Sequence, residues 1–334
     1  MGGHLLHHWN LPENRLSRND YLEVQRVVID KLVSRLGYAR RIEALRSFAD
    51  KASFGDLDCA LEVFEDDSIK WGEFLKELFG FQPHKNSNVY SFPVNGFQVD
   101  VLLFSREIYD SALNYYAFEN GNFVGRIADK LGLSYGHRGL YLQVPLSYFD
   151  AALPAHHFKE ILVTRDPDMI YRLLGFDYEQ LKKGFNNVSE MAQWVARSRY
   201  FAPQLFQYDA LNHTNRTRNK KRPVYAEFVE WCATQPAKES LPSVEIVRAS
   251  VMATFGHING EMDKHRAQLL KDAERRAKFN GNLIAELKNI TGVELGRFIV
   301  AFKKSVGVDF EAWLDVNSAE SVKTALEKFS LTES

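Results

Sequence analysis

The chain has 334 residues, of which 45% are hydrophobic and 25% are charged, and its net charge is −1. This length allows two domains with a sizeable core, and the composition is ordinary for a globular protein. The near-neutral charge excludes a polycation, so any surface for nucleic acid must be local. The two cysteines, Cys59 and Cys232, lie far apart in the sequence. They form neither a disulfide framework nor a zinc-binding Cys-x-x-Cys pair, which predicts a reducing, cytoplasmic environment.

The N-terminus and the hydropathy pattern predict neither secretion nor membrane insertion. Residues 1–9 lack a basic start followed by a long apolar run, so we expect no signal peptide. No run of about 18 apolar residues occurs, which predicts that no helix crosses a membrane. We interpret His4, His7 and His8 as part of a solvated tail in preference to a metal site.

Helical and strand patterns alternate over the first third of the chain. Apolar residues recur at helical spacing over residues 21–36, with Asn19 or Asp20 as the cap and Gly37 as the end. The same spacing over residues 69–79 predicts a second helix. The dipeptide Asn95-Gly96 is a strong hairpin signal. We therefore expect strands at residues 41–48, 56–63, 89–94 and 97–104, with the last two joined by that turn.

The middle of the chain changes from mixed to helical patterns. Residues 108–133 are predicted to be helical in two pieces, interrupted at Gly121 and Asn122. Residues 134–139 are predicted to be a polar loop that leads into a short strand at residues 140–144. Beyond about residue 165 we expect helices at residues 167–175, 178–184, 189–198, 224–234, 242–255 and 261–279.

This change predicts a domain boundary at about residue 165, which separates residues 1–165 from residues 166–334. The predicted fold class is α+β, with an N-terminal mixed sheet and flanking helices followed by an all-helical C-terminal domain.

Three aspartates occupy positions where charge is costly. Asp56 and Asp58 alternate along a predicted strand, so both side chains face the same side, roughly 7 Å apart. They could simply face water after Gly55, but Asp100 interrupts an apolar strand, where an unpartnered charge is unfavourable. A bound cation would make such a cluster tolerable. Since Mg²⁺ prefers carboxylate and phosphate oxygens, the sequence predicts a Mg²⁺ site for phosphate chemistry.

Three short motifs follow one another in order: Arg46-Ser47-Phe48, Gly55-Asp56-Leu57-Asp58 and Val99-Asp100-Val101. This order resembles the signature of the DNA polymerase β-like nucleotidyltransferase superfamily. In that signature Gly-Ser follows a strand, Asp-h-Asp comes next (h is hydrophobic), and h-Asp-h lies inside a later strand. The resemblance covers about residues 20–145 and implies that the N-terminal mixed sheet is nucleotidyltransferase-like.

The resemblance also implies roles for individual residues. Asp56, Asp58 and Asp100 would bind two divalent ions and act as the catalytic carboxylates, and Ser47 would contact the triphosphate. One position departs from the signature, because Arg46 stands where the family has glycine. Glycine allows the backbone to approach a phosphate closely, whereas Arg46 would either bind the triphosphate itself or mark a degraded site.

Residues 120–126 lie where polymerase-type members of that superfamily carry a nucleotide-binding helix. The resemblance implies that Arg126 reaches a phosphate and that Phe123 stacks on a sugar or base. The alternative is a helix start with a buried Phe123 and a solvated Arg126.

A second candidate binding segment spans residues 212–222, which contain basic side chains and no acid. Basic side chains bind phosphate backbones, and the aromatic residues just before this segment could stack on bases. The alternative is a solvated, mobile loop. The basic residues are Arg216, Arg218, Lys220, Lys221 and Arg222.

Together these features predict a metal-dependent nucleotidyltransferase that moves a nucleoside monophosphate from a nucleoside triphosphate (NTP) to a hydroxyl and releases pyrophosphate. We expect Mg²⁺ or Mn²⁺ as the cofactor and the 3′ end of RNA, with tRNA as a candidate, as the acceptor; RNA is favoured over DNA. Two alternatives stay open: an enzyme of the same fold that modifies a small molecule or a protein, and a catalytically decayed nucleic-acid-binding protein. The sequence indicates neither the base preferred, nor templating, nor the oligomeric state.

Overall fold

The computed structural model describes residues 4–151, 157–238, 240–306 and 309–330. The chain forms two compact units, one of residues 1–144 with 158–255 and the other of residues 145–157 with 256–334. The first unit contains mixed sheet and helices, and the second is helical. The predicted α+β class, with a mixed sheet followed by a helical C-terminal region, is confirmed.

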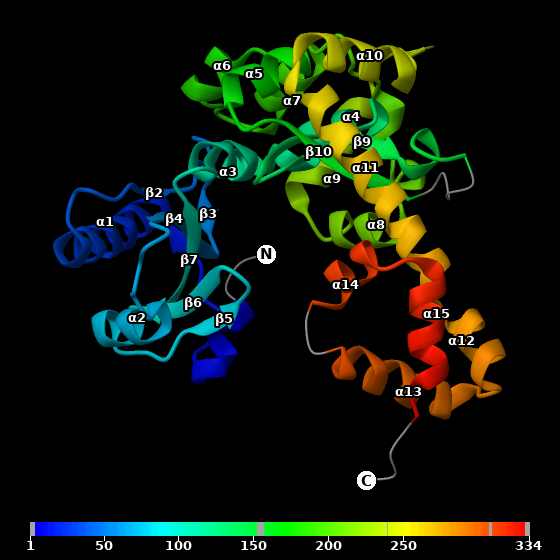
Figure 1. Cartoon of the computed structure of the whole chain (residues 1–334). Coiled ribbons are helices and arrows are strands. Elements are labelled where there is room, and N and C mark those ends of the chain that lie inside the picture. The colour runs from blue at the N-terminus through cyan, green and yellow to red at the C-terminus, as the bar shows by residue number, and fades with distance from the viewer. Residues whose placement is uncertain (1–3, 152–156, 239, 307–308, 331–334) are drawn as a thin grey trace. The chain divides into compact units, whose positions relative to one another are not determined.

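The first unit contains a five-stranded mixed sheet (Figure 1). In spatial order its strands are β2 (Ile42–Ala44), β4 (Asp56–Val63), β7 (Phe97–Ser105), β6 (Val89–Val94) and β5 (His84–Asn86). β4 and β7 run parallel, and the other neighbours are antiparallel. Asn95 and Gly96 between β6 and β7 have φ values of 50° and 73°, as a two-residue hairpin turn requires. The strand predicted at residues 41–48 is shorter, because residues 45–52 leave the sheet as a loop.

One face of this sheet carries a large apolar core. α1 (Arg18–Leu36) and α2 (Trp71–Phe79) pack on this face (Figure 1). The cap of α1 is Ser17, whose hydroxyl accepts a hydrogen bond from the Asp20 N–H at 3.4 Å. The helix therefore begins earlier than the predicted cap at Asn19 or Asp20, because serine supplies the side-chain acceptor that a helix start needs.

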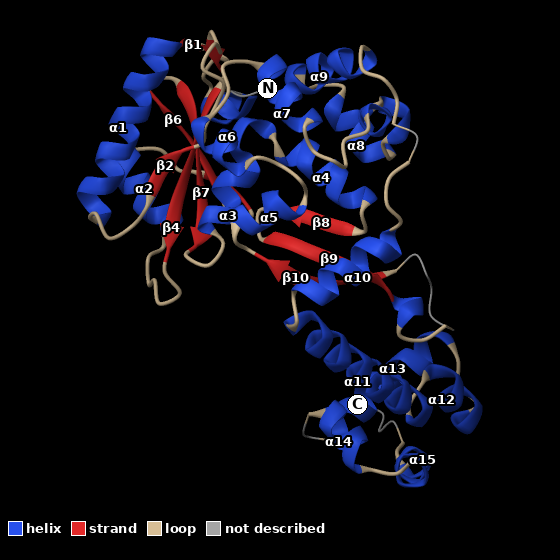
Figure 2. Ribbon diagram, turned by 90° about the horizontal axis from the view of Figure 1, so that it is seen from above, coloured by secondary structure: helices blue, strands red, loops and turns tan. Residues whose placement is uncertain are grey.

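The opposite face of the sheet holds the three aspartates. α3 (Tyr109–Tyr116) packs on this face over Ala60, Leu102 and Phe104 (Figure 2). Side chains alternate along a strand, so Asp56, Asp58 and Asp100 project from the face that α3 covers. They lie toward the N-terminal ends of β4 and β7, whereas α3 packs farther along these two strands.

A three-stranded sheet with the order β10-β9-β8 follows in the same unit, and α4 (Gly121–Lys130) packs against β8. The predicted loop at residues 134–139 is wrong, because Gly136 pairs with Gly139 across a tight hairpin turn. Gly139 has φ of 123°, and a Cβ there would lie 2.7 Å from the Thr164 carbonyl oxygen, so a side chain would not fit. The strands are β8 (Leu133–Gly136), β9 (Gly139–Pro145) and β10 (Phe158–Thr164), and a separate short pair joins β1 (Leu16–Ser17) to β3 (Ser53–Phe54).

The break between α3 and α4 differs from the prediction. The predicted interruption at Gly121 and Asn122 is wrong, because Gly121 is the first residue of α4. The chain instead turns at the short helix η2 (Ala117–Glu119), where Phe118 and Glu119 have φ values of 54° and 57°. Such backbone conformations cost non-glycine residues about 1–3 kcal/mol each and persist only where the surrounding structure enforces them.

The remaining helices of the first unit confirm the helical pattern predicted beyond residue 165. α7 packs against α9, and aromatic side chains such as Trp194 and Phe228 fill this region. Residues 158–255 belong to the same compact unit as the sheets. The predicted division of roles, catalysis in residues 1–165 and acceptor binding in residues 166–334, stays a prediction. The elements are α5 (Pro167–Leu173), α6 (Tyr178–Lys183), α7 (Val188–Ala196), η4 (Pro203–Phe206), η5 (Tyr208–Ala210), α8 (His213–Asn219), α9 (Pro223–Ala233) and α10 (Val244–Thr254).

The second unit has its own core, formed by residues such as Ile284, Phe298 and Phe302. Arg275 on α11 donates hydrogen bonds to Asp315 at 2.6 and 2.7 Å, which ties α11 to α14. In the described part of the chain, no helix is both long and apolar enough to cross a membrane. The elements are η3 (Leu146–Tyr148), α11 (His257–Lys278), α12 (Gly281–Lys288), α13 (Gly292–Ser305), α14 (Phe310–Val316) and α15 (Ala319–Lys328).

Candidate functional site

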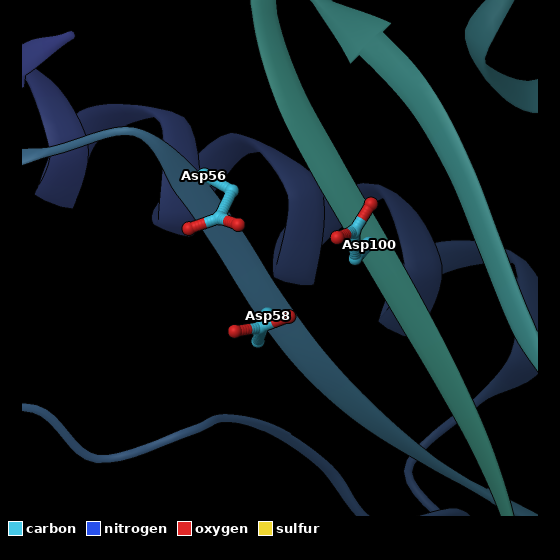
Figure 3. Close-up of side chains that lie close together, drawn as sticks. All are labelled: Asp56, Asp58 and Asp100. Carbon is cyan, nitrogen blue, oxygen red and sulfur yellow. The ribbon is translucent and has the colours of Figure 1, made fainter. Parts of the chain in front are cut away.

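The three predicted aspartates converge on one face of the five-stranded sheet (Figure 3). Asp56 and Asp58 alternate along β4, and Asp100 lies on the neighbouring strand β7, where it pairs in register with Asp58. Each carboxylate offers an oxygen, and these oxygens all lie within 4.8 Å of one another. Among the residues that the structure describes, this is the one group of three or more histidine, cysteine, aspartate or glutamate side chains that could hold a metal ion.

The environment of the cluster opposes ionisation. Burial, and then the charges of Asp56 and Asp100, raise the pKa of Asp58 well above its usual range. Burial also raises the pKa of Asp100 to about 6, although hydrogen bonds from Ser91 and Gln98 lower it in part. Carboxylates that share a half-buried site repel one another, and a cation bound between them relieves this repulsion. The arrangement therefore suits a divalent metal ion.

Two polar side chains that the sequence analysis missed hold Asp100. The Gln98 amide nitrogen donates to both Asp100 carboxylate oxygens at 3.0 Å, and Ser91 lies directly opposite Asp100 on β6. Ser91 and Gln98 are both buried. The sequence held a signal for each: the Asn95-Gly96 turn sets the register that pairs Ser91 with Asp100, and Gln98 shares the face of Asp100 at the i, i+2 spacing.

The loop that contains Ser47 begins beside the aspartates. The Leu45 N–H donates to the Asp58 carbonyl oxygen at 2.9 Å, which fixes the start of the loop against β4. The other end is held where Ala49 and Asp50 donate to carbonyls of residues 185–186, at 3.1 and 2.9 Å. Ser47 lines a cavity of about 600 Å³.

Lys51 in the same loop was also missed by the sequence analysis. Its positive charge lowers the pKa of Asp58, against the larger effects of burial and of the other two aspartates. The ammonium group lies 4.8 Å from the centre of the Phe54 ring. Lys51 therefore contributes a positive charge that acts on the carboxylate cluster.

Arg46, which stands where the resembling family has glycine, is engaged elsewhere. Its guanidinium donates to the carbonyl oxygens of Leu181 and Lys182, at 2.9 and 3.2 Å, in the last turn of α6. It also donates to the Asn114 side-chain oxygen at 3.1 Å and lies over the Phe118 ring. In this arrangement Arg46 satisfies the carbonyls at a helix end, and its contact with a triphosphate stays a prediction.

The two residues predicted on α4 have structural contacts. Phe123 is fully buried against Tyr225 and Phe228, so the predicted stacking on a sugar or base is wrong for this conformation. Arg126 donates to the Leu205 carbonyl oxygen at 3.0 Å and to the Ala210 carbonyl oxygen, and it pairs with an aspartate on its own helix. It also lines a polar cavity of about 320 Å³ together with Asn122 and Arg218.

Residues 213–219 of the basic segment form the helix α8 in place of the loop considered in the sequence analysis, and Lys220, Lys221 and Arg222 follow this helix. Asn212 caps it by accepting a hydrogen bond from the Asn215 N–H at 2.9 Å. Arg216 donates to carbonyl oxygens of residues 208–211, and Arg218 donates to the Asn122 side chain at 2.6 Å. Lys220 and Lys221 are exposed. The segment therefore combines arginines that hold structure with lysines that face solvent.

Arg222 pairs with an acid whose charge acts on Asp58. It forms an ion pair with Glu119 at 3.3 Å, and Glu119 is one of the acids whose charge raises the pKa of Asp58. Glu119 is also one of the two residues with positive φ in the turn between α3 and α4. Strained residues of this kind are common at functional sites.

No protein-family model and no curated protein matches the chain. Among solved structures, the chain is similar to a ternary P/T complex of Leishmania infantum polymerase β, with 14% identity and a TM-score of 0.38 over 52% of this chain and 84% of that one. It is also similar to the ternary gap complex of the same polymerase, with 15% identity and a TM-score of 0.38 over 49% of this chain and 69% of that one. Both of these structures are polymerase β chains.

Proposed function

We propose that this chain is a metal-dependent nucleotidyltransferase with Asp56, Asp58 and Asp100 as its catalytic carboxylates. The observation that carries the proposal is the convergence of these side chains, whose oxygens lie within 4.8 Å of one another on one face of the sheet. Three hard oxygen donors fit Mg²⁺ or Mn²⁺. The raised pKa values of Asp58 and Asp100 support the same proposal, because a bound cation favours the ionised carboxylates.

In the proposed reaction the acceptor hydroxyl oxygen attacks the α-phosphorus of an NTP. The bond from this phosphorus to the oxygen that bridges the β-phosphate breaks, so the nucleoside monophosphate joins the acceptor and pyrophosphate leaves. The hydroxyl proton passes to Asp100, a carboxylate that Gln98 and Ser91 hold in place. Divalent cations held by Asp56, Asp58 and Asp100 would supply charge neutralisation at the transferring phosphate.

The NTP phosphates are proposed to bind at the loop of residues 45–52. Ser47 offers a hydroxyl donor there, and Lys51 offers a cation whose charge already acts on Asp58. The hydrogen bond from Leu45 to the Asp58 carbonyl supports this assignment, because it keeps the loop beside the carboxylates.

The proposed acceptor is the 3′ end of RNA, bound in part by the basic segment. Exposed lysines at 220 and 221 suit a phosphate backbone. The ion pair between Arg222 and Glu119 supports a path from this segment to the cluster, since the charge of Glu119 acts on Asp58. A small-molecule or protein acceptor would not need these lysines.

The test is an incorporation assay with each labelled NTP, Mg²⁺ or Mn²⁺, and separate pools of RNA, DNA and protein. We expect label on RNA with the wild-type chain and loss of label, by at least about a hundredfold, with Asp58→Asn. Asp66→Asn is the matched control, because Asp66 is an exposed acid on the loop that follows the same strand.

Each outcome of this assay is informative. Label on DNA or protein would replace the proposed acceptor and keep the reaction. Full activity of Asp58→Asn would overturn the mechanism, and absence of label with every pool would favour the decayed-site alternative.

A further inference from the structure

The N-terminal segment of the chain docks beside the carboxylate cluster. The short helix η1 (His4–Trp9) packs on β6 and β7, the strands that carry Ser91 and Asp100. Leu6 is fully buried, and the Trp9 indole N–H donates to the Gln82 carbonyl oxygen at 3.2 Å. These contacts hold η1 on the sheet.

A hydrogen-bond chain leads from η1 to Asp100. The Leu5 N–H donates to the Gln98 side-chain oxygen at 3.0 Å, and the Gln98 side-chain nitrogen donates to both Asp100 oxygens at 3.0 Å. The first N–H groups of a helix lack partners within the helix, so the Leu5 N–H is available for this contact. Gln98 is buried, and it pairs in register with Asp56.

The Leu5 contact selects one orientation of the Gln98 amide. An amide has a carbonyl oxygen that accepts and an NH₂ group that donates. If the amide turned over, its NH₂ would face the Leu5 N–H, and its oxygen would face the Asp100 carboxylate. Both contacts would then be repulsive. The donor from η1 therefore keeps the NH₂ group directed at Asp100.

We propose that residues 4–9 are a positioning element of the carboxylate cluster. These residues act through the Leu5 N–H and the Gln98 amide, which hold Asp100 in the geometry that binds metal. This inference rests on the proposed metal site. It makes a segment 93 residues away in sequence from Gln98 part of the site. Gln98 is then a positioning residue, since its amide acts through Asp100.

The chain offers a matched pair of substitutions at position 5. Leu5→Pro removes the N–H, and proline is tolerated in the first turn of a helix. Leu5→Ala keeps the N–H and removes most of the side chain, so it is the control for packing. Gln98→Met removes both contacts of the amide while it keeps a side chain of similar length.

The experiment measures Mn²⁺ affinity of the full chain by calorimetric titration. We expect Gln98→Met to weaken binding by about 10- to 100-fold, as loss of a partner of a metal ligand does. Leu5→Pro should weaken it by about three- to tenfold, and Leu5→Ala by less than about twofold. In the Gln98→Met background, Leu5→Pro should add less than about twofold, because the two changes break the same chain of contacts.

A second measurement separates this inference from the proposed function. The side-chain amide resonance of Gln98, identified by its loss in Gln98→Met, should shift in Leu5→Pro and stay in place in Leu5→Ala. If the wild-type chain binds no Mn²⁺, the proposed metal site fails and this inference fails with it. A shift of the resonance would then show only that the hydrogen bond from Leu5 to Gln98 exists.

Two results would overturn the positioning role while the metal site stands. One is unchanged Mn²⁺ affinity in Leu5→Pro, and the other is an equal loss in Leu5→Pro and Leu5→Ala. A melting temperature that falls without a change in affinity would likewise assign η1 a structural role only.

Discussion

At the scale of residues, the three aspartates converge although Arg46 stands at the glycine position of the signature. Arg46 replaces the glycine of the resembling signature, and its guanidinium is held by carbonyls of α6 and by Asn114. The three aspartates nevertheless converge within 4.8 Å. The arginine is therefore compatible with an intact set of carboxylates, and the incorporation assay decides between an active and a decayed site.

The raised pKa values predict how the metal-free chain responds to pH. A carboxyl group whose pKa is higher in the folded than in the unfolded chain binds more protons when folded, so stability falls as pH rises through that interval. For Asp100 the interval ends at a pKa of about 6, and for Asp58 the pKa is also raised. Each unit of difference corresponds to about 1.4 kcal/mol.

We therefore expect Asp58→Asn to be more stable than the wild type at about pH 7.5 without divalent ions, and this advantage should shrink by about pH 5. Denaturant unfolding of both chains at the two pH values, with chelator present, measures the difference. Saturating Mn²⁺ should reverse the order at the higher pH, because only the wild type keeps all three ligands. An advantage that grows on acidification would contradict the assignment of the raised pKa values to this cluster.

At the scale of elements, local signals explain what the sequence could predict. The alternation of side chains along a strand predicted that Asp56 and Asp58 share one face of β4. The Asn95-Gly96 turn predicted the hairpin of β6 and β7 that contains Asp100. The convergence of the three aspartates follows from these two local patterns and from the parallel pairing of β4 with β7.

Features that depend on distant contacts were not predictable in the same way. The bond from Leu5 to Gln98 and the ion pair from Arg222 to Glu119 join residues 93 and 103 positions apart, and no pattern within a segment marks them. The left-handed turn at Phe118 and Glu119 was missed for a related reason, since neither residue favours positive φ and the surrounding structure imposes it.

The basic segment carries a prediction at this scale, because its basic residues divide into two groups: Arg216 and Arg218 lie on α8, and Lys220 and Lys221 follow it. Lys220→Ala with Lys221→Ala should weaken binding of single-stranded RNA and reduce the slope of log affinity against log salt by about 1.4, with unchanged melting temperature. Arg216→Ala should instead lower stability, since Arg216 donates to several backbone carbonyls. Fluorescence anisotropy over a salt series measures the slope.

The control for this prediction is Lys76→Ala with Lys85→Ala, which removes two exposed lysines from other elements. An equal change in slope with the control pair would mean that RNA contacts the surface without preference for the basic segment. An unchanged slope in Lys220→Ala with Lys221→Ala would remove the segment from the proposed acceptor site.

At the scale of the whole molecule, the chain has two compact units, each with an apolar core. The carboxylate cluster, η1 and the basic segment all belong to the first unit. A ligand that binds only the folded state stabilises the unit that holds its site. Metal binding should therefore act on one unit and leave the other unchanged.

Calorimetric melting of the full chain tests this expectation. We expect two transitions, and Mn²⁺ at about 100 times its dissociation constant should stabilise the first unit by about 2.7 kcal/mol, which raises its melting temperature by about 5–10 °C. Phe302→Ala identifies the other transition, because Phe302 is buried in the core of the second unit and its loss costs about 3–5 kcal/mol there. Asp58→Asn should abolish the shift with Mn²⁺ and leave the transition that responds to Phe302→Ala in place. A shift of both transitions by Mn²⁺ would show that the two units unfold as one, or that a second metal site lies outside the aspartate cluster.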